Sequence, residues 1–122
     1  MDMHAFNRFC ATYTAATHVQ QWGASQVWKV GGKVFAIGAM SKSGEPAYSF
    51  KTSDLNYHFL CQQAGYIPAP YLASRGLKWI QQIATNGELD DDLNYYLSES
   101  YRIVATSLSL KKQRELGLVL KS

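Results

Sequence analysis

A two-glycine turn between two apolar runs constrains the fold of this 122-residue chain more than any other feature. Residues 26–30 and 33–40 lie on either side of Gly31 and Gly32, and both segments are rich in valine, isoleucine and aromatic residues. Glycine accepts the positive φ angles that a two-residue primed turn requires. The segment therefore predicts an antiparallel β-hairpin.

The predicted register assigns the hairpin side chains to two faces. Trp28 opposes Phe35 in this register. Because directly opposed residues share a face, these two residues and Ile37 are expected to form one apolar face. Lys29 projects from the other face, and Lys33 lies across the turn from it. The two lysines are therefore expected on opposite sides of the hairpin tip.

The rest of the chain predicts helices and short strands around this hairpin. Apolar residues at three- and four-residue steps indicate helices at residues 2–14 and 91–108. Ser53 is expected to cap a helix that runs to Ala64 and buries Leu55, Phe59 and Leu60. The other expected elements are an edge strand at 18–21, a strand at 47–51, an extended segment at 67–70, a strand at 78–84, and a basic segment at 109–122 with a short helical turn.

The order of the main elements, α-β-β-β-α-β-α, is not the regular alternation that builds a doubly wound parallel sheet. We predict an α+β fold in which one mainly antiparallel sheet has helices packed on it. A chain of this length buries roughly two-thirds of its unfolded surface, which suits one domain spanning residues 1–122. Hydrophobic residues make up 47% of the sequence, so an intrinsically disordered chain is not expected.

The compartment is predicted from the targeting and membrane-spanning segments that the sequence does not show. The first residues carry neither a basic nor a long apolar region, so no secretory signal is expected. The longest apolar stretch, residues 34–40, is far shorter than the roughly 20 residues that span a bilayer. Cys10 and Cys61 are too few for a disulfide framework and are expected to be reduced. We expect a cytoplasmic protein with no membrane partner.

Motifs for catalysis or metal binding are missing from the pattern. His4, His18 and His58 fall in three different predicted elements and lack the paired spacing of a zinc site. No Gly-x-Ser-x-Gly elbow surrounds a serine, and Gly31-Gly32 lacks the spacing of a phosphate-binding loop. The sequence therefore predicts a protein that is not an enzyme, without a metal or a cofactor.

A basic surface is the remaining candidate for function. The net charge is +3 and the sequence pI is about 8.9, which permits an anionic partner without requiring one. Cations at the hairpin tip suit contact with phosphates, although lysines near strand ends also serve to prevent aggregation. Trp22 and Trp79 either stack on bases or belong to the core. Five residues are candidates for nucleic-acid binding: Lys29, Lys33, Lys51, Arg75 and Lys78.

Several stretches, taken in order, resemble one family of small bacterial proteins. They are Trp22, VWKVGGKVFAI at 27–37, AYSFKTSD at 47–54, PAPYL at 68–72, Lys78-Trp79, Gly87-Glu88-Leu89, and SESY at 98–101. Over nearly its whole length the chain resembles the YjbR (MmcQ/YjbR-like) family. The resemblance implies helices packed on one antiparallel sheet, a fold likened to frataxin (CyaY-like) and to type III secretion chaperones. It also implies a proposed double-wing DNA-binding motif, and it supplies no catalytic residues.

Some family positions map onto this chain and others do not. The family's segment of Lys, Thr or Cys, and Ser or Asp corresponds to residues 51–53, and its basic segment before the fourth strand corresponds to Arg75, Lys78 and Trp79. Many members have a histidine immediately before that tryptophan, where this chain has Lys78. A role for that histidine is therefore not carried over.

Two functions are open at this point. The first is DNA binding through the basic hairpin as a wing, with phosphate contacts that are largely independent of sequence. The alternative is a protein-interaction or chaperone-like module without nucleic-acid binding, which requires an exposed apolar patch. The expected partner is accordingly DNA or another protein.

Overall fold

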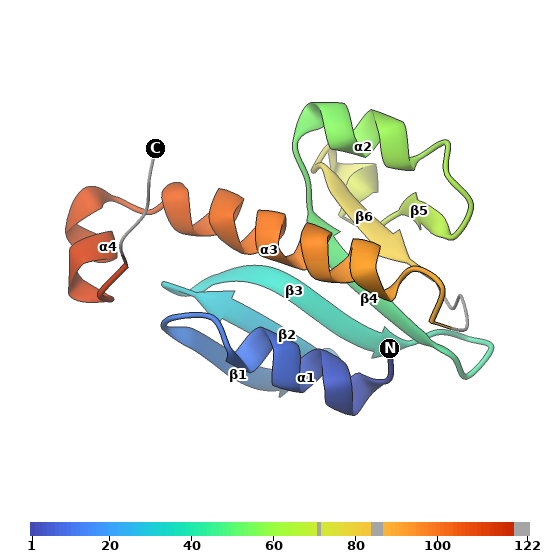
Figure 1. Cartoon of the computed structure of the whole chain (residues 1–122), viewed down its shortest axis with the longest axis horizontal. Coiled ribbons are helices and arrows are strands. Elements are labelled where there is room, and N and C mark those ends of the chain that lie inside the picture. Colours follow the sequence, from blue (N-terminus) through green and yellow to red (C-terminus); the bar gives the residue numbers. More distant parts are fainter. Residues whose placement is uncertain (71, 84–86, 119–122) are drawn as a thin grey trace.

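A computed structural model describes residues 1–70, 72–83 and 87–118 of the chain (Figure 1). Its elements, in order, are α1 (Met3–Ala11), β1 (Ala16–Gln21), β2 (Ser25–Val30), β3 (Lys33–Met40), β4 (Pro46–Lys51), α2 (Asp54–Leu60), β5 (Tyr66–Pro68), the 3-10 turn η1 (Ala73–Arg75), β6 (Trp79–Gln82), α3 (Asp90–Thr106) and α4 (Leu110–Glu115). The strands form one antiparallel sheet in the order β1-β2-β3-β4-β6-β5.

The predicted α+β class and single antiparallel sheet are confirmed, and the edge strand expected at 18–21 forms as β1. The order of the main elements left β1 out, and residues 67–70 were expected only as an extended segment, where β5 forms the other edge of the sheet. β1 is polar and exposed along most of its length, and β5 has only three residues and ends in Pro68. Neither has the apolar alternation that signals a half-buried strand. None of the described helices combines the length and apolarity needed to cross a membrane.

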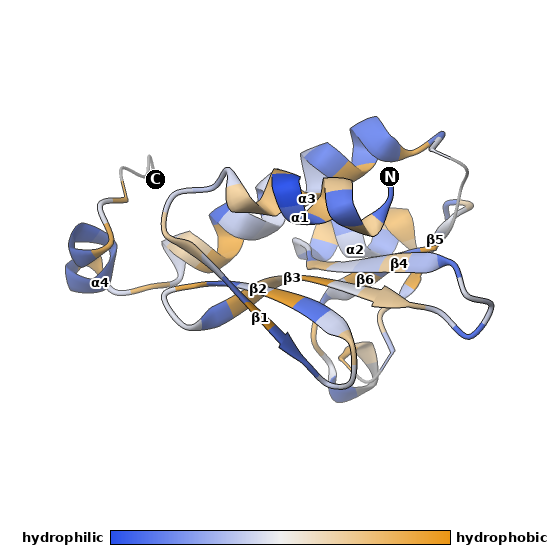
Figure 2. Cartoon of the chain, turned by 90° about the horizontal axis from the view of Figure 1, so that it is seen from below, coloured by the Kyte–Doolittle hydropathy of each residue, from blue (hydrophilic) through white to orange (hydrophobic). Residues whose placement is uncertain are grey.

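Helices α1 and α3 lie on the same side of the sheet and enclose the core (Figure 2). Aromatic pairs connect the layers: Phe6 of α1 stacks on Tyr48 with ring centroids 4.8 Å apart, and Phe35 meets Tyr101 of α3 edge-on at 5.3 Å. Gly38 allows the close approach of α1, because a Cβ at this position would lie 2.7 Å from the Phe6 ring. We call this side the helix face of the sheet, and the opposite side the far face.

A β-bulge corrects the predicted register of the central hairpin. The turn at Gly31-Gly32 forms as expected, but the register shifts between Trp28 and Lys29. Trp28 therefore pairs with Ala36, and not with Phe35 as predicted. A bulge places one extra residue on one strand, and here Phe35 and Ala36 are both buried.

The same pairing corrects the position of Ile37. It pairs with Val27 on the far face, and so does not share a face with Trp28. A register read from the turn alone has no means of locating the extra residue, and every side chain beyond it changes face.

Helix α2 also differs from the prediction. Leu60 is buried as expected, but Leu55 is 80% exposed and Phe59 is 53% exposed. The helix ends at Leu60 and not at Ala64. The cause is its place in the fold: α2 contacts β5 and β6 at the edge of the sheet, so only a narrow side of the helix is covered. The Ser53 cap is confirmed, since its hydroxyl accepts the N–H of Asn56 at 3.2 Å.

Candidate nucleic-acid interface

The tip of the β2–β3 hairpin rests against the C-terminal end of α3. Gly31 and Gly32 have φ angles of 59° and 83°, which only glycine adopts readily. A Cβ on Gly31 would lie 2.7 Å from Cδ1 of Leu108, immediately after α3. The tip is therefore packed against the junction between α3 and α4 and is not a free arm (Figure 1).

Lys29 and Lys33 lie on opposite sides of this tip. Lys29 pairs with Val34, and Lys33 pairs with Val30, a buried core residue. Adjacent pairs along a strand point to opposite faces, so Lys33 lies on the helix face and Lys29 on the far face. Lys33 Nζ donates to Ser107 Oγ at 3.3 Å. This contact places a cation at the C-terminal end of α3, where the helix dipole favours positive charge.

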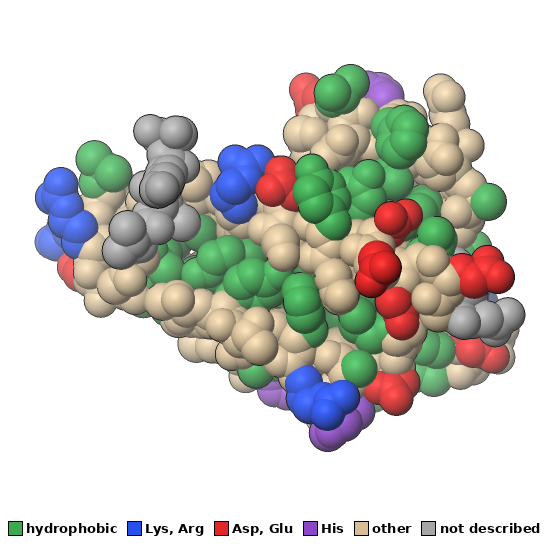
Figure 3. Space-filling model, in the orientation of Figure 1, with side chains coloured by type: hydrophobic (Ala, Val, Ile, Leu, Met, Phe, Trp, Pro, Cys, Tyr) green, Lys and Arg blue, Asp and Glu red, His purple; other side chains and the backbone are tan. Residues whose placement is uncertain are grey.

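Helix α4 adds further cations to this end of the molecule. Ser109 caps the helix, accepting the N–H of Lys112 at 3.1 Å. The side chains of Lys111, Lys112 and Arg114 are exposed, and Figure 3 shows blue side chains over α4 at one extremity. A basic segment was predicted at 109–122, but its residues were not among the five candidates for nucleic-acid binding. Their signal was the sequence LKKQR beside a predicted helix end.

Lys51 joins Lys29 on the far face of the sheet. Lys51 ends β4 and pairs with Trp79. It belongs to the same face as Ser49, which pairs in register with Ile37. One strand separates β2 from β4, so the backbones carrying Lys29 and Lys51 are about 10 Å apart. These two cations therefore belong to one surface, and Lys33 lies across the sheet from them.

Arg75 and Lys78 have separate surroundings. Arg75 ends η1 and lines a groove over the far face. Lys78 Nζ lies 4.8 Å from the ring centroid of Tyr57, a cation–π contact directed toward α2. The five predicted cations thus do not form one patch. Of the two tryptophans considered for stacking, Trp79 is buried and Trp22 is exposed.

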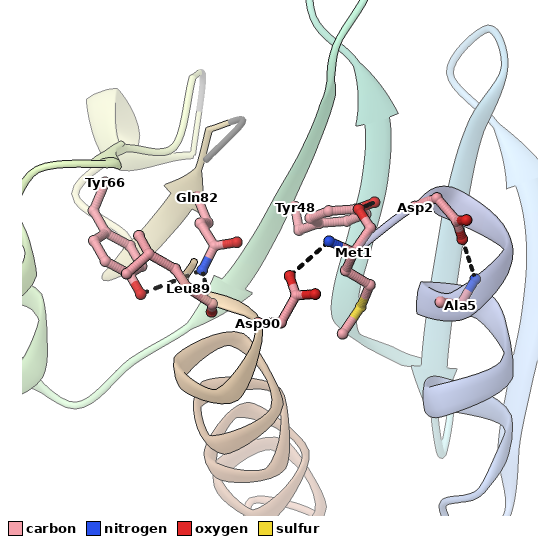
Figure 4. Close-up of polar contacts among 8 residues, drawn as sticks. All are labelled: Met1, Asp2, Ala5, Tyr48, Tyr66, Gln82, Leu89 and Asp90. Carbon is pink, nitrogen blue, oxygen red and sulfur yellow. Dashed lines mark hydrogen bonds and ion pairs between the residues drawn. The ribbon is translucent and has the colours of Figure 1, made fainter. Parts of the chain in front are cut away.

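Acidic residues gather at the N-terminal end of α3, far from α4. Asp90, Asp91 and Asp92 form the first turn of the helix, where its dipole favours anions. The ammonium group of Met1 lies 2.6 Å from Asp90 Oδ1, and Tyr48 donates to the Met1 carbonyl at 2.7 Å (Figure 4). Figure 3 shows acidic side chains gathered near this end and basic side chains over α4, with further Lys or Arg side chains between the two ends.

The SESY segment has a structural role in this fold. The Ser98 hydroxyl lies 2.5 Å from the Tyr13 hydroxyl and donates to the Asn94 carbonyl one turn back. Tyr101 donates to the Thr14 carbonyl at 2.6 Å, and burial raises the pKa of its phenol. The hydroxyl groups connect α3 to the α1–β1 region. These hydrogen bonds give Ser98 and Tyr101 a structural role in holding the two regions together.

The described residues bring together no group of three histidine, cysteine or acidic side chains that could hold a metal ion. His18 bonds to Gln26 at 2.6 Å and lies against the Trp28 ring. Both cysteines are free thiols, Cys10 buried and Cys61 exposed.

An antiparallel sheet with two helices on one face and a basic hairpin beside a basic helix defines a small α+β protein of the kind that the sequence resembles. A family model described as YjbR matches residues 11–103, and the chain belongs to the YjbR family. The fold is similar to the crystal structure of Deinococcus radiodurans protein DR2400, which has a DUF419 domain, with a TM-score of 0.80 and 18% sequence identity. The match covers 95% of this chain and 88% of that chain. No curated protein matches the chain.

Proposed function

We propose that this protein binds DNA through the β2–β3 hairpin and α4. The observation that supports the proposal is the contact between Lys33 and Ser107, which brings the hairpin tip to the end of the chain that carries α4. The hairpin tip and α4 then carry five cations: Lys29, Lys33, Lys111, Lys112 and Arg114.

The hairpin acts as a wing in this mechanism. Its tip is narrow because both turn residues are glycines, and one lysine flanks it on each side. Lysine ammonium groups are compact, hydrated charges that contact phosphate oxygens without a fixed geometry. Contacts of this kind position a protein on the backbone and carry no sequence information. The binding is accordingly expected to be independent of base sequence.

The opposite pole sets the orientation of the complex. Asp90, Asp91 and Asp92 repel phosphates at the far end of α3. A protein with one basic and one acidic end is steered by the field of a polyanion so that its basic end arrives first. The net charge of +3 understates the charge at the basic end, because the negative charges of the acidic end are subtracted from it.

Fluorescence anisotropy of a labelled duplex at about 50 and 200 mM salt tests the proposal. If about four phosphates are neutralised, the affinity falls about a hundredfold between these concentrations. Absence of binding at the lower salt concentration contradicts DNA binding at this surface. Two duplexes of unrelated sequence should bind with equal affinity, and a clear preference would contradict a backbone-only mode.

A second candidate function, a protein-interaction module, is favoured by α2. Leu55 and Phe59 are one helical turn apart and are exposed, and Tyr95 of α3 is 56% exposed. Figure 3 shows hydrophobic side chains gathered on α2 and on the neighbouring part of α3. Contiguous exposed apolar patches are typical of interaction sites. Sedimentation velocity over a range of concentrations tests self-association, which Leu55→Asp with Phe59→Asp should abolish. A strict monomer would exclude a second copy as the partner of this patch.

A further inference from the structure

The far face of the sheet carries a groove that the proposed function does not use. Its volume is about 580 Å³, within the range of small-molecule sites. Strands β3, β4 and β6 supply its floor through Ile37, Ser49 and Gln81. Trp22 of the β1–β2 turn and Arg75 of η1 are also in the lining. Helices α1 and α3 lie on the other side of the sheet (Figure 2) and leave this groove uncovered.

Trp22 is held in an unfavourable environment at this groove. Its side chain is 63% exposed, whereas Trp28 and Trp79 are 7% and 6% exposed. Its φ angle is 52°, a left-handed conformation that is rare for a bulky residue. The Ser25 hydroxyl donates to the Trp22 carbonyl at 3.2 Å and thereby supports the turn. Backbone strain of this kind persists at ligand sites, and an exposed indole offers a flat surface for stacking.

The floor offers hydrogen-bonding groups. Gln81 Nε2 donates to Ser49 Oγ at 3.4 Å across β4 and β6, and Ser49 is only 5% exposed. This bond uses one of the two amide hydrogens of Gln81. A side-chain amide carries a second hydrogen and a carbonyl oxygen, so it can pair with the edge of a heteroaromatic ring.

The charge of the lining is positive. Arg75 is exposed at the end of η1, and Gly76 follows it with a φ angle of 80°, which ends the turn. None of the described residues that line the groove is acidic. A guanidinium group presents paired donors that match a phosphate, and it does so best without a competing carboxylate.

We infer that this groove binds a nucleotide. The base stacks on Trp22, the Gln81 amide pairs with the edge of the base, and Arg75 binds the phosphate. A free mononucleotide and an unpaired nucleotide of a single strand share this chemistry. The inference does not rest on the proposed function, because Lys29, Lys33 and the α4 cations are not in the lining.

Titration with AMP, followed by tryptophan fluorescence, tests the site. Trp22 is the exposed residue among the three tryptophans, so iodide-accessible emission reports mainly on it. We expect saturable quenching and protection from iodide. Arg75→Gln should weaken AMP binding about tenfold or more, since it removes a charge-assisted bond. Lys42→Gln removes one exposed charge outside the lining and should have no effect. Trp22→Phe should remove the quenching signal and, by NMR titration, weaken binding without unfolding the protein.

Titration with an oligonucleotide distinguishes a free mononucleotide from a nucleotide within a single strand. A single-stranded oligoadenylate that binds at least tenfold more tightly than AMP, with the same dependence on Arg75, indicates a strand; equal affinity indicates a free nucleotide. The double variant Lys29→Glu with Lys33→Glu should bind AMP as tightly as the parent protein. Failure of duplex binding and failure of nucleotide binding in the groove can therefore be distinguished. No saturable change up to about 5 mM AMP, or an affinity that Arg75→Gln leaves unchanged, would overturn the inference.

Discussion

The buried hydroxyl of Ser100 on α3 donates a hydrogen bond to the carbonyl oxygen of Phe35 at a distance of 2.6 Å. Ser100 Oγ also accepts the backbone N–H of Lys51 at 2.8 Å. Phe35 is the residue that the bulge leaves without a partner on β2. One side chain of α3 thus satisfies a carbonyl at the bulge of β3 and an N–H at the end of β4, and it joins both strands to the helix.

Ser100→Ala should lower the free energy of unfolding by about 1–3 kcal/mol. The substitution leaves a buried carbonyl and a partly buried N–H without partners, and such groups are destabilising by about this amount. Urea denaturation monitored by circular dichroism measures the change. Thr106→Ala, on the exposed side of the same helix, serves as the control and should change stability by less than about 0.5 kcal/mol. Equal effects of the two substitutions would show that the Ser100 bonds contribute little.

Gly38→Ala should destabilise the protein by about 1–3 kcal/mol, because the new methyl group would overlap the ring of Phe6 and the sulfur of Met3. Combining it with Phe6→Leu should give less destabilisation than the sum of the two single substitutions, since the smaller side chain makes room. Thermal unfolding of the four proteins measures this coupling. Strict additivity would mean that α1 moves away from the sheet at little cost.

Stability should fall in alkaline solution. Burial raises the pKa of Cys10 from 9.0 to about 12 and that of Tyr66 from 10.0 to about 12, and it raises the pKa of Tyr48. Groups with a raised folded-state pKa contribute their full stability below the unfolded pKa and lose it as the pH rises toward the folded value. The free energy of unfolding should therefore decline from about pH 9 to pH 12. Urea denaturation at several pH values measures this decline. A free energy of unfolding that stays constant over this pH range would contradict the burial of these groups.

The two cysteines should differ in reactivity. Cys61 is exposed, and Cys10 is fully buried with its thiol kept protonated by the raised pKa. Because the thiolate is the reactive form, Ellman's reagent at pH 8 should modify one thiol quickly and the second only after unfolding. Cys61→Ser should abolish the fast phase. Rapid reaction of both thiols in the folded protein would show that α1 opens readily.

Most of the fold could be predicted from local patterns, and the exceptions have physical causes. The glycine turn and the Ser53 cap are local devices that the sequence displays directly. The bulge at Phe35 meets α3 through the Ser100 hydroxyl, a contact between distant segments that no pattern within the hairpin reveals. The exposure of Leu55 and Phe59 depends on where α2 meets the sheet, so helical periodicity alone assigned them to the core incorrectly.

The candidate site was predicted in part. The opposite orientation of Lys29 and Lys33 follows from strand alternation and was expected from the turn. The inclusion of α4 was missed because the packing of Leu108 on Gly31 joins segments about 75 residues apart. The far-face groove was missed for the same reason, since its lining comes from the β1–β2 turn region, β3, β4, the η1 region and β6, which only the sheet brings together.

Charge reversal at the hairpin tests the central claim most directly. Lys29→Glu with Lys33→Glu is compared with Arg8→Glu with Lys42→Glu, which makes the same change in net charge on α1 and on the β3–β4 turn, away from the tip. In duplex anisotropy at about 50 mM salt, the hairpin variant should bind at least about tenfold more weakly, with a shallower salt dependence, because two phosphate contacts are lost. The control variant should bind nearly as well as the parent protein. Equal loss of affinity in both variants would mean that only net charge matters and would contradict a DNA-binding role for the hairpin.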